Sequence, residues 1–440
     1  MPLFTAPRGL RRLSLAGAAG LILALGAVSA AQAANYRSCV RFQVKTVDSG
    51  IGIPDGPNAG GTEDYYITAN AGVDAIAHGV RVRMTRGAWS QVYDAEPSTG
   101  CFNWSNASAS GFSMRVYGYA TLGDGNVVRI HNAPDDFSSY PGATYSILRS
   151  NLSPTPNGSD TYAVGSYDPK WTAFSVLAFG LYRYNVGLSN KTIHVGLNSS
   201  CSDASAHYGD SNDHITEGRH YLKLGNCAWE PGVSTPPTVR KFIVSHELGH
   251  AIAALYYGAQ GGAVDGGEPA MDYTHPAQGA CTQGGSYYSM RSVEWSSVNF
   301  REGFAHFVAA AIWNSSSGTE AAFHWFESST HDLERYAYGA GALSGGRMEN
   351  ECGGPFTDAS TDEDWMRFFW DFYTNTTVTC NERPSALQML QLYAQTRLNG
   401  GLTSRNYYDK MRAAAQQLDL SACVKTERFD SVADFNGINH

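Results

Sequence analysis

The sequence predicts an α+β protein, with an N-terminal antiparallel β-sandwich followed by a mixed lobe and a helical C-terminal lobe. The first observation is that short segments before residue 150 alternate apolar and polar residues, most clearly at 80–84, 112–117 and 126–131. Clusters of Gly, Pro, Asn and Asp separate these segments, as expected for a sandwich with one solvated face. The second observation is that apolar residues recur at helical spacing over long segments from about residue 235 onward.

Residues 1–33 are predicted to be an export signal. A basic start that contains Arg11 and Arg12 precedes the apolar residues 13–30, and small residues at 31–33 form a cleavage site. The protein is therefore expected to be secreted or to reach a periplasmic or extracellular location. No later segment approaches about 18 uninterrupted apolar residues, so no transmembrane segment is expected.

Three segments are expected after the signal. Residues 34–150 form the β-sandwich, which could present substrate, bind a surface or act as a prodomain. Residues 151–170 are rich in Ser, Pro, Gly and Asn and are predicted to be a linker. Residues 171–440 form the second domain, which is expected to begin with a helix at 171–184 and a strand at 191–197.

The strongest chemical signal is the pentapeptide His246-Glu247-Leu248-Gly249-His250. Two histidines four apart on a helix lie on one face, so both imidazoles can bind one metal ion. The glutamate between them can reach a water molecule in the open position of that ion. Zinc suits these ligands, because it accepts neutral nitrogen donors and lowers the pKa of bound water to about 7.

The residues around the pentapeptide predict a buried helix. Thr235 is expected to be the N-cap, with Pro236 and Pro237 at the first helical positions. Residues 239–257 contain no proline and are largely apolar, and Gly258 is expected to end the helix. Histidines on a buried helix must find polar partners, which favours a metal site.

This helix resembles the active-site helix of the zincin metallopeptidases, which carries His-Glu-x-x-His. The metzincin branch needs Gly and His three and six positions after the second histidine, and the chain has Ala253 and Tyr256 there. That branch is excluded. The resemblance covers residues 235–313 and implies a mixed lobe and a helical lobe with the metal between them. Just before it, residues 214–224 predict a strand that could pair with an extended substrate or simply belong to the sheet.

The third ligand is expected on a second buried helix at 297–313, where Glu302 and His306 lie four apart on one face. This is similar to the gluzincin branch, in which a glutamate on a following helix completes the zinc site. Two assignments stay open: Glu302 binds the metal with His306 behind it, or His306 binds the metal with Glu302 nearby. A further alternative is that Glu302 pairs only with Arg301 or another cation.

The resemblance implies one catalytic Zn²⁺ held by His246, His250 and Glu302, with Glu247 as the general base toward a zinc-activated water. The expected function is that of a secreted zinc endopeptidase acting on protein or peptide substrates. The alternative is a surface-binding or adhesive protein with an inactive zincin scaffold. A third interpretation is hydrolysis of a non-peptide amide in a cell wall.

All eight cysteines follow residue 33, and an even number in an exported protein favours four disulfides. We expect the cysteines to pair in sequence order, the first with the second, the third with the fourth, and so on. The expected pairs are Cys39–Cys101, Cys201–Cys227, Cys281–Cys352 and Cys380–Cys423.

The net charge of −9 and a pI near 5.8 argue against nucleic acid or an anionic membrane as partner. Helical periodicity in the C-terminal part predicts helices at 362–373, 384–398 and 404–418. An acidic cluster at the start of the first of these could hold structural Ca²⁺, but its spacing favours a charged helix start. The cluster consists of Asp358, Asp362, Glu363 and Asp364.

Overall fold

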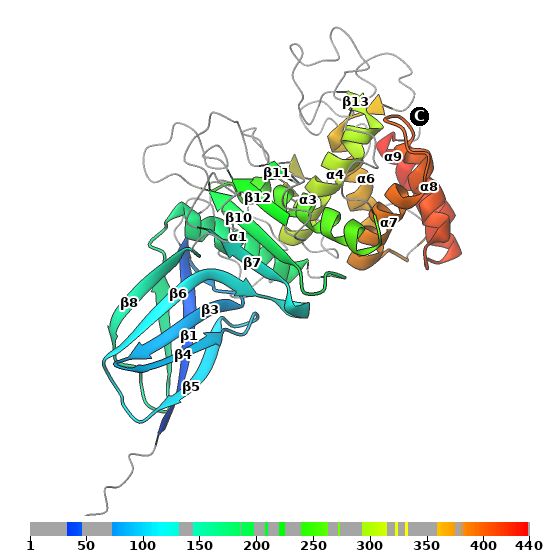
Figure 1. Cartoon of the computed structure of the whole chain (residues 1–440). Helices are drawn as coiled ribbons and strands as arrows, with labels where there is room; N and C mark the ends of the chain where they lie inside the picture. The colour runs from blue at the N-terminus through cyan, green and yellow to red at the C-terminus, as the bar shows by residue number, and fades with distance from the viewer. Residues whose placement is uncertain are drawn as a thin grey trace, which may run out of the picture.

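The computed structural model describes residues 33–45, 73–131, 144–184, 186–197, 207–209, 220–224, 239–262, 272, 293–314, 322–323, 331–332, 359–374, 380 and 382–438. The expected export signal at 1–33 lies almost entirely outside this part of the chain. Most strands lie at one end of the molecule and most helices at the other (Figure 1). The fold is α+β, as predicted, and its sheets contain antiparallel pairs.

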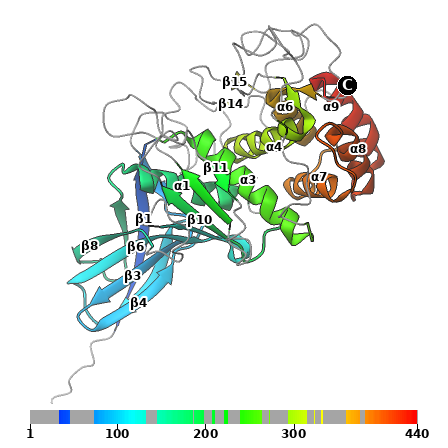
Figure 2. The ribbon, with the colours of Figure 1, turned by 45° about the horizontal axis from the view of Figure 1, so that its top comes forward.

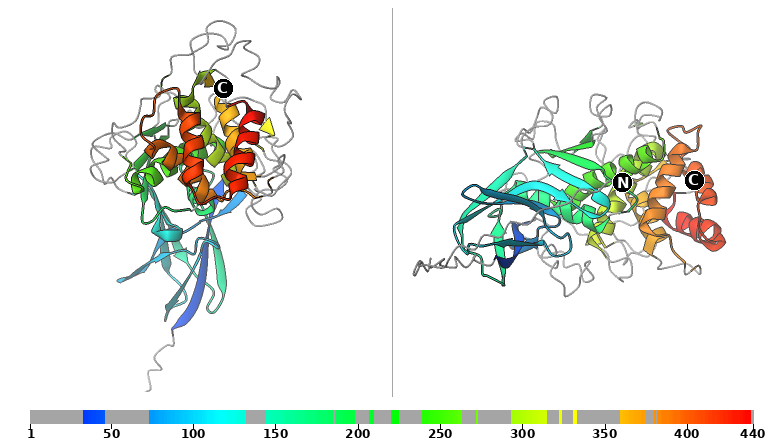
Figure 3. Two further views of the ribbon diagram at one scale, coloured as in Figure 1. Left: turned by 90° about the vertical axis from the view of Figure 1, so that its right-hand side faces the viewer. Right: turned by 60° about the horizontal axis from the view of Figure 1, so that its bottom comes forward.

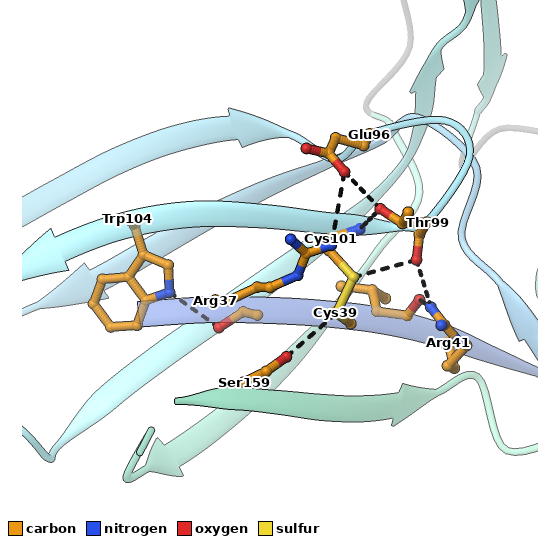
Figure 4. The surroundings of a disulfide bond; sticks show 10 residues. Arg37, Cys39, Arg41, Glu96, Thr99, Cys101, Trp104 and Ser159 are labelled. Carbon is orange, nitrogen blue, oxygen red and sulfur yellow. Dashed lines mark hydrogen bonds and ion pairs between the residues drawn. A yellow bond between two sulfur atoms is a disulfide. The ribbon is translucent and has the colours of Figure 1, made fainter. Parts of the chain in front are cut away.

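A small sheet is built around β1 (Ala34–Val44). It pairs antiparallel with β2 (Val73–Ile76) and β5 (Cys101–Asn106), and parallel with β9 (Ser159–Val164). Residues opposite each other in the β1–β5 ladder include Cys39 and Cys101, which form a disulfide (Figure 4). This confirms the first expected cysteine pair.

The larger sheet has eight strands. Its antiparallel part contains β3 (Val80–Arg86), β4 (Trp89–Asp94), β6 (Phe112–Thr121), β7 (Val127–Ile130) and β8 (Ser146–Leu152). β10 (Thr192–Leu197) pairs parallel with both β7 and β12 (His220–Leu224), and β11 (His207–Gly209) pairs antiparallel with β12. Buried residues alternate with half-buried or exposed residues along β3 and β6, as expected for strands with one solvated face.

The linker expected over residues 151–170 is not present. β8 extends to Leu152, β9 occupies Ser159–Val164, and helix α1 (Pro169–Arg183) starts before the expected boundary. The parallel β7–β10 ladder also carries the large sheet across that boundary. Residues of the expected sandwich and the expected second domain therefore belong to one continuous sheet.

Helix α1 lies where the two sheets meet the helical part. Asp168 caps its N-terminus by accepting a hydrogen bond from the backbone N–H of Lys170, and Pro169 occupies the first helical position. The Trp171 ring stacks on Phe42 of β1 with centroids 5.2 Å apart, and Phe179 packs on Trp313 with centroids 4.8 Å apart. One buried helix thus joins the core of the sheets to the core of the helices.

The remaining helices pack together at the C-terminal end of the molecule (Figure 3). They are α3 (Lys241–Ala259), α4 (Ser296–Trp313), α6 (Asp362–Thr374), α7 (Ala386–Leu398), α8 (Tyr407–Gln417), a π-helical turn (Val424–Arg428) and α9 (Phe429–Asn436). Short strand pairs accompany them: β13 (Glu294–Trp295) with β16 (Ala359–Ser360), and β14 (Ala322–Phe323) with β15 (His331–Asp332). The expected helices at 171–184, 362–373, 384–398 and 404–418 are confirmed to within three residues at each end, whereas the last two helical segments were not predicted.

The Cys380–Cys423 disulfide is also as expected. It lies beside the buried Arg428, whose guanidinium donates hydrogen bonds to the carbonyl oxygens of Asp371, Phe372 and Cys380. The other two expected pairs involve cysteines outside the described residues. Within the described part of the chain, no helix combines the length and the apolar character that crossing a membrane requires.

Candidate metal centre

Helix α3 carries the pentapeptide, and its surroundings are as apolar as predicted. His246 has 3% of its surface exposed and Glu247 has 6%. Helix α3 starts at Lys241 with Arg240 as its N-cap, later than the predicted start at Pro236. Val239, two residues before the helix, is a β-bridge residue. Its C-terminus at Ala259 lies one residue beyond the expected stop at Gly258.

Helix α4 runs against α3 (Figure 2), and Gly249 sets how closely the two approach. A Cβ atom at Gly249 would lie 2.8 Å from the backbone oxygen of Ala305 and 3.0 Å from its Cα. The glycine inside the pentapeptide therefore allows the helix backbones to touch. On the opposite side of α4, a Cβ at Gly303 would lie 2.5 Å from the Trp365 Cβ on α6. Helix α4 is therefore held between two close helix contacts.

This approach brings Glu302 of α4 onto the two histidines of α3. Glu302 Oε2 lies 3.1 Å from His246 Nε2 and 3.3 Å from His250 Nε2, and the two Nε2 atoms are 3.1 Å apart. Donor atoms about 2.0–2.1 Å from a tetrahedral zinc ion are roughly 3.3–3.4 Å from one another. The observed spacing fits three ligands of one ion. Among the described residues, this is the only such group of His, Cys, Asp or Glu.

The charges at this group depend on burial and on mutual pairing. Burial lowers the pKa of His246 to about 4, although its hydrogen bond to Glu302 acts in the opposite direction. Burial is the largest influence on His250 and acts to lower its pKa, but the charge of Glu302, its hydrogen bond to His250 and the charge of Glu247 together raise it. Burial would raise the pKa of Glu302, yet the two histidines hold it well below its ordinary value. The group therefore offers an ionised carboxylate and a neutral imidazole, both of which are metal donors.

Glu302 and His306, the two candidates for the third ligand, lie in different positions relative to the histidines of α3. Glu302 belongs to the three-donor group, whereas the buried His306 ring packs against the His246 ring with centroids 4.1 Å apart and against Phe323 at 5.4 Å. Arg301 donates to the Tyr407 hydroxyl at 3.3 Å, while the Glu302 carboxylate contacts both histidines of α3. The geometry favours Glu302 as the ligand, with His306 behind His246.

One contact that sequence reasoning missed holds the two site helices together. The indole N–H of Trp313, at the end of α4, donates a hydrogen bond to the Ser245 hydroxyl at 2.8 Å. Ser245 directly precedes His246 in the sequence. Both side chains are buried. The pattern of the sequence gave no signal for this contact, because a serine next to a motif histidine has no characteristic spacing to a distant tryptophan.

The strand predicted at 214–224 is present over His220–Leu224 as β12, and the rest of that range lies outside the described residues. β12 is not at the edge of the sheet as described, because β11 pairs with its outer side. β11 runs antiparallel to its neighbour, and both strands contact α3. Among the described strands, β11 is thus the terminal strand at this end of the sheet.

Three of the four acidic residues considered for calcium, Asp362, Glu363 and Asp364, lie in the first turn of α6. The Asp364 carboxylate accepts hydrogen bonds from the Thr361 N–H at 3.1 Å and from its hydroxyl at 2.7 Å. The Thr361 hydroxyl accepts in turn from the Asp364 N–H at 3.2 Å. This reciprocal cap accounts for Asp364 at the beginning of α6. Asp358 lies outside the described residues.

Comparisons of the chain with models of protein families, with curated proteins and with solved structures found no match.

Proposed function

We propose that the protein is an exported zinc-dependent endopeptidase of the gluzincin type. The observation that carries the proposal is the convergence of His246, His250 and Glu302, whose donor atoms are spaced as ligands of one tetrahedral ion. Two imidazole nitrogens and one carboxylate oxygen favour Zn²⁺ over Ca²⁺ and Mg²⁺, which prefer oxygen donors. Two disulfides and the predicted signal support export.

When bound, zinc would supply a Lewis acid that polarises a carbonyl group and lowers the pKa of water. Glu247 follows His246 on the same helix and is itself buried. Its carboxylate would take a proton from the attacking water and then give it to the leaving amine. Its low exposure keeps bulk water from competing for that proton.

The edge of the large sheet supports an extended peptide as the substrate. β11 contacts α3 and lies at the end of the described sheet. A peptide that added to this edge by backbone hydrogen bonds would lie along the helix that carries the metal ligands. Such main-chain recognition suits an endopeptidase, because it does not depend on a free terminus.

The test begins with metal analysis of the purified chain, which should contain about one zinc ion per molecule. Glu247→Gln should retain that zinc and reduce cleavage of an unfolded protein such as casein at least about 100-fold, since a general base contributes roughly 10²–10⁴-fold. Glu427→Gln is the matched control, because Glu427 is exposed on the C-terminal π-helical turn. It should cleave normally.

A zinc-free protein without chelator-sensitive cleavage would contradict the proposal and favour the adhesive alternative. Undiminished cleavage by Glu247→Gln would contradict the role given to Glu247. Cleavage of a cell-wall amide without cleavage of peptide bonds would replace the proposed substrate class while keeping the site.

A further inference from the structure

The outer face of the large sheet carries positive charge that the whole chain, with a net charge of −9, does not predict. The antiparallel strands β3, β4, β6, β7 and β8 contain one acidic residue, Asp94. Their arginines are Arg81, Arg83, Arg86, Arg115, Arg129 and Arg149. Inward-facing Val82 and Val116 are buried between the outward-facing positions. We call the outward-facing Arg81, Arg83, Arg115, Arg129, Tyr117 and Tyr119 the arginine face.

Two arginines of this face oppose each other directly. Arg83 on β3 and Arg115 on β6 are register partners in the antiparallel ladder, and both are exposed. Like charges at directly opposite positions destabilise a sheet. Arg81 forms a bidentate salt bridge with Asp94, with Nε–Oδ1 at 2.7 Å and Nη2–Oδ2 at 2.8 Å. No described carboxylate forms a salt bridge with Arg83 or Arg115. The fold therefore keeps an unfavourable pair that a bound anion would neutralise.

Apolar side chains flank this pair at the same level of the sheet. Val92 on β4 is the register partner of Arg83, and Leu148 on β8 is the partner of Arg115. Val92 is 45% exposed and Leu148 is 49% exposed, which places both among the few large apolar side chains exposed in the described residues. Four neighbouring strands thus present an apolar residue, two arginines and a second apolar residue in one row.

A pocket of about 260 Å³ opens beside the row. Arg81, Arg83 and Arg129 line it together with Val92, Tyr117 and Tyr119. The Arg81 guanidinium lies 4.0 Å from the centre of the Tyr119 ring, and Arg129 donates to the Thr144 hydroxyl at 2.8 Å. These contacts fix guanidinium groups at the rim of a pocket large enough for a phosphate group.

We propose that the arginine face binds the surface of an anionic phospholipid bilayer. Guanidinium groups match lipid phosphates, and tyrosine rings favour the membrane–water interface. Val92 and Leu148 would enter the region between the headgroups. A dissolved polyanion would satisfy the arginines but leave both aliphatic side chains in water. Only charges within about a Debye length of the bilayer interact with it strongly. The net negative charge of the whole chain therefore does not prevent the arginine face from binding an anionic bilayer.

The test is co-sedimentation of the full chain with vesicles of phosphatidylcholine alone or mixed with phosphatidylglycerol. The chain should bind only the mixed vesicles, and binding should fall as ionic strength rises. Arg83→Gln with Arg115→Gln should lower the partition coefficient roughly thirtyfold, which corresponds to about 1 kcal/mol for each arginine near the surface. Leu148→Ser should also weaken binding.

Arg37→Gln is the matched control, because Arg37 lies on β1 of the other sheet and its side chain is 43% exposed. It should leave vesicle binding unchanged, and the double arginine variant should unfold at the same or a higher temperature than the parent. Equal losses in the control and the double variant would overturn the proposal. So would binding of inorganic phosphate, heparin or nucleic acid by a chain that does not bind the mixed vesicles. The outcome is independent of the proposed peptidase activity.

Discussion

Replacement of Gly249 by alanine tests whether the contact between α3 and α4 builds the metal centre. The added Cβ would lie 2.8 Å from the Ala305 oxygen, whereas ordinary contacts begin at 3.4 Å. Because backbone atoms cannot rotate away, the helices must separate by about 0.6 Å or more at this point, which is comparable to the roughly 0.5 Å tolerance of a functional site. Overpacking of this kind costs about 1–3 kcal/mol. Glu302 would move with α4, so we expect zinc affinity to fall about tenfold or more.

Gly180→Ala is the matched control for this variant. Gly180 lies in α1, and its added Cβ would meet the Leu248 Cδ2 at 2.7 Å and the Ile312 Cδ1 at 3.2 Å, which are the ends of flexible side chains. Both substitutions gain about 1 kcal/mol of helix propensity, so this term cancels between them. Urea unfolding of the zinc-free chains measures the difference in stability between the two variants. Competition with a chelating dye measures the difference in their zinc affinity. Equal stability and equal zinc affinity of the two variants would refute the reasoning.

Two further predictions concern titratable groups. Glu302→Gln should weaken zinc binding more than His306→Gln does in the same dye competition, because only Glu302 belongs to the three-donor group; the reverse order would identify His306 as the ligand. Burial lowers the pKa of His78 from 6.5 to about 4 in the folded chain, so the unfolded chain binds the proton first and stability is lost as the pH falls from about 6.5 toward 4. The loss should approach about 3 kcal/mol in denaturant titrations at several pH values and be absent in His78→Asn; an identical pH dependence in that variant would exclude His78 as its source.

The sequence predicted features that depend on local pattern. His246 and His250 share a face because four residues make about one turn, and Glu247 lies between them wherever that helix forms. Cys39 and Cys101 were paired by proximity along the chain, and the β1–β5 ladder places them directly opposite. The choice between Glu302 and His306 stays open from the sequence alone, because it depends on how closely two helices approach each other, and His250 and Glu302 on these helices are 52 positions apart in the sequence.

The predicted linker shows where local pattern is insufficient. Pro156 and Asn157 do form a turn, and Asn157 has a left-handed backbone conformation. Between them and α1, however, Ser159–Val164 pairs with β1 more than 100 residues earlier in the chain. A parallel partner at that distance leaves no trace in the composition of the segment. The same holds for β7 and β10, which join two parts of the chain that composition separates.

The continuous sheet and α1 connect the strands of the N-terminal part to α3, the helix that carries His246 and His250. β10 and β12 extend the strands of the sandwich toward α3, and α1 packs on β1, β7 and α3. A change in the relative position of the two ends would have to break the β7–β10 ladder or displace the buried Trp171 and Phe179. Because packed cores resist such displacement, the arginine face and the metal centre should keep a fixed orientation toward each other. If that face lies on a bilayer, the orientation of the metal centre above the bilayer is fixed as well.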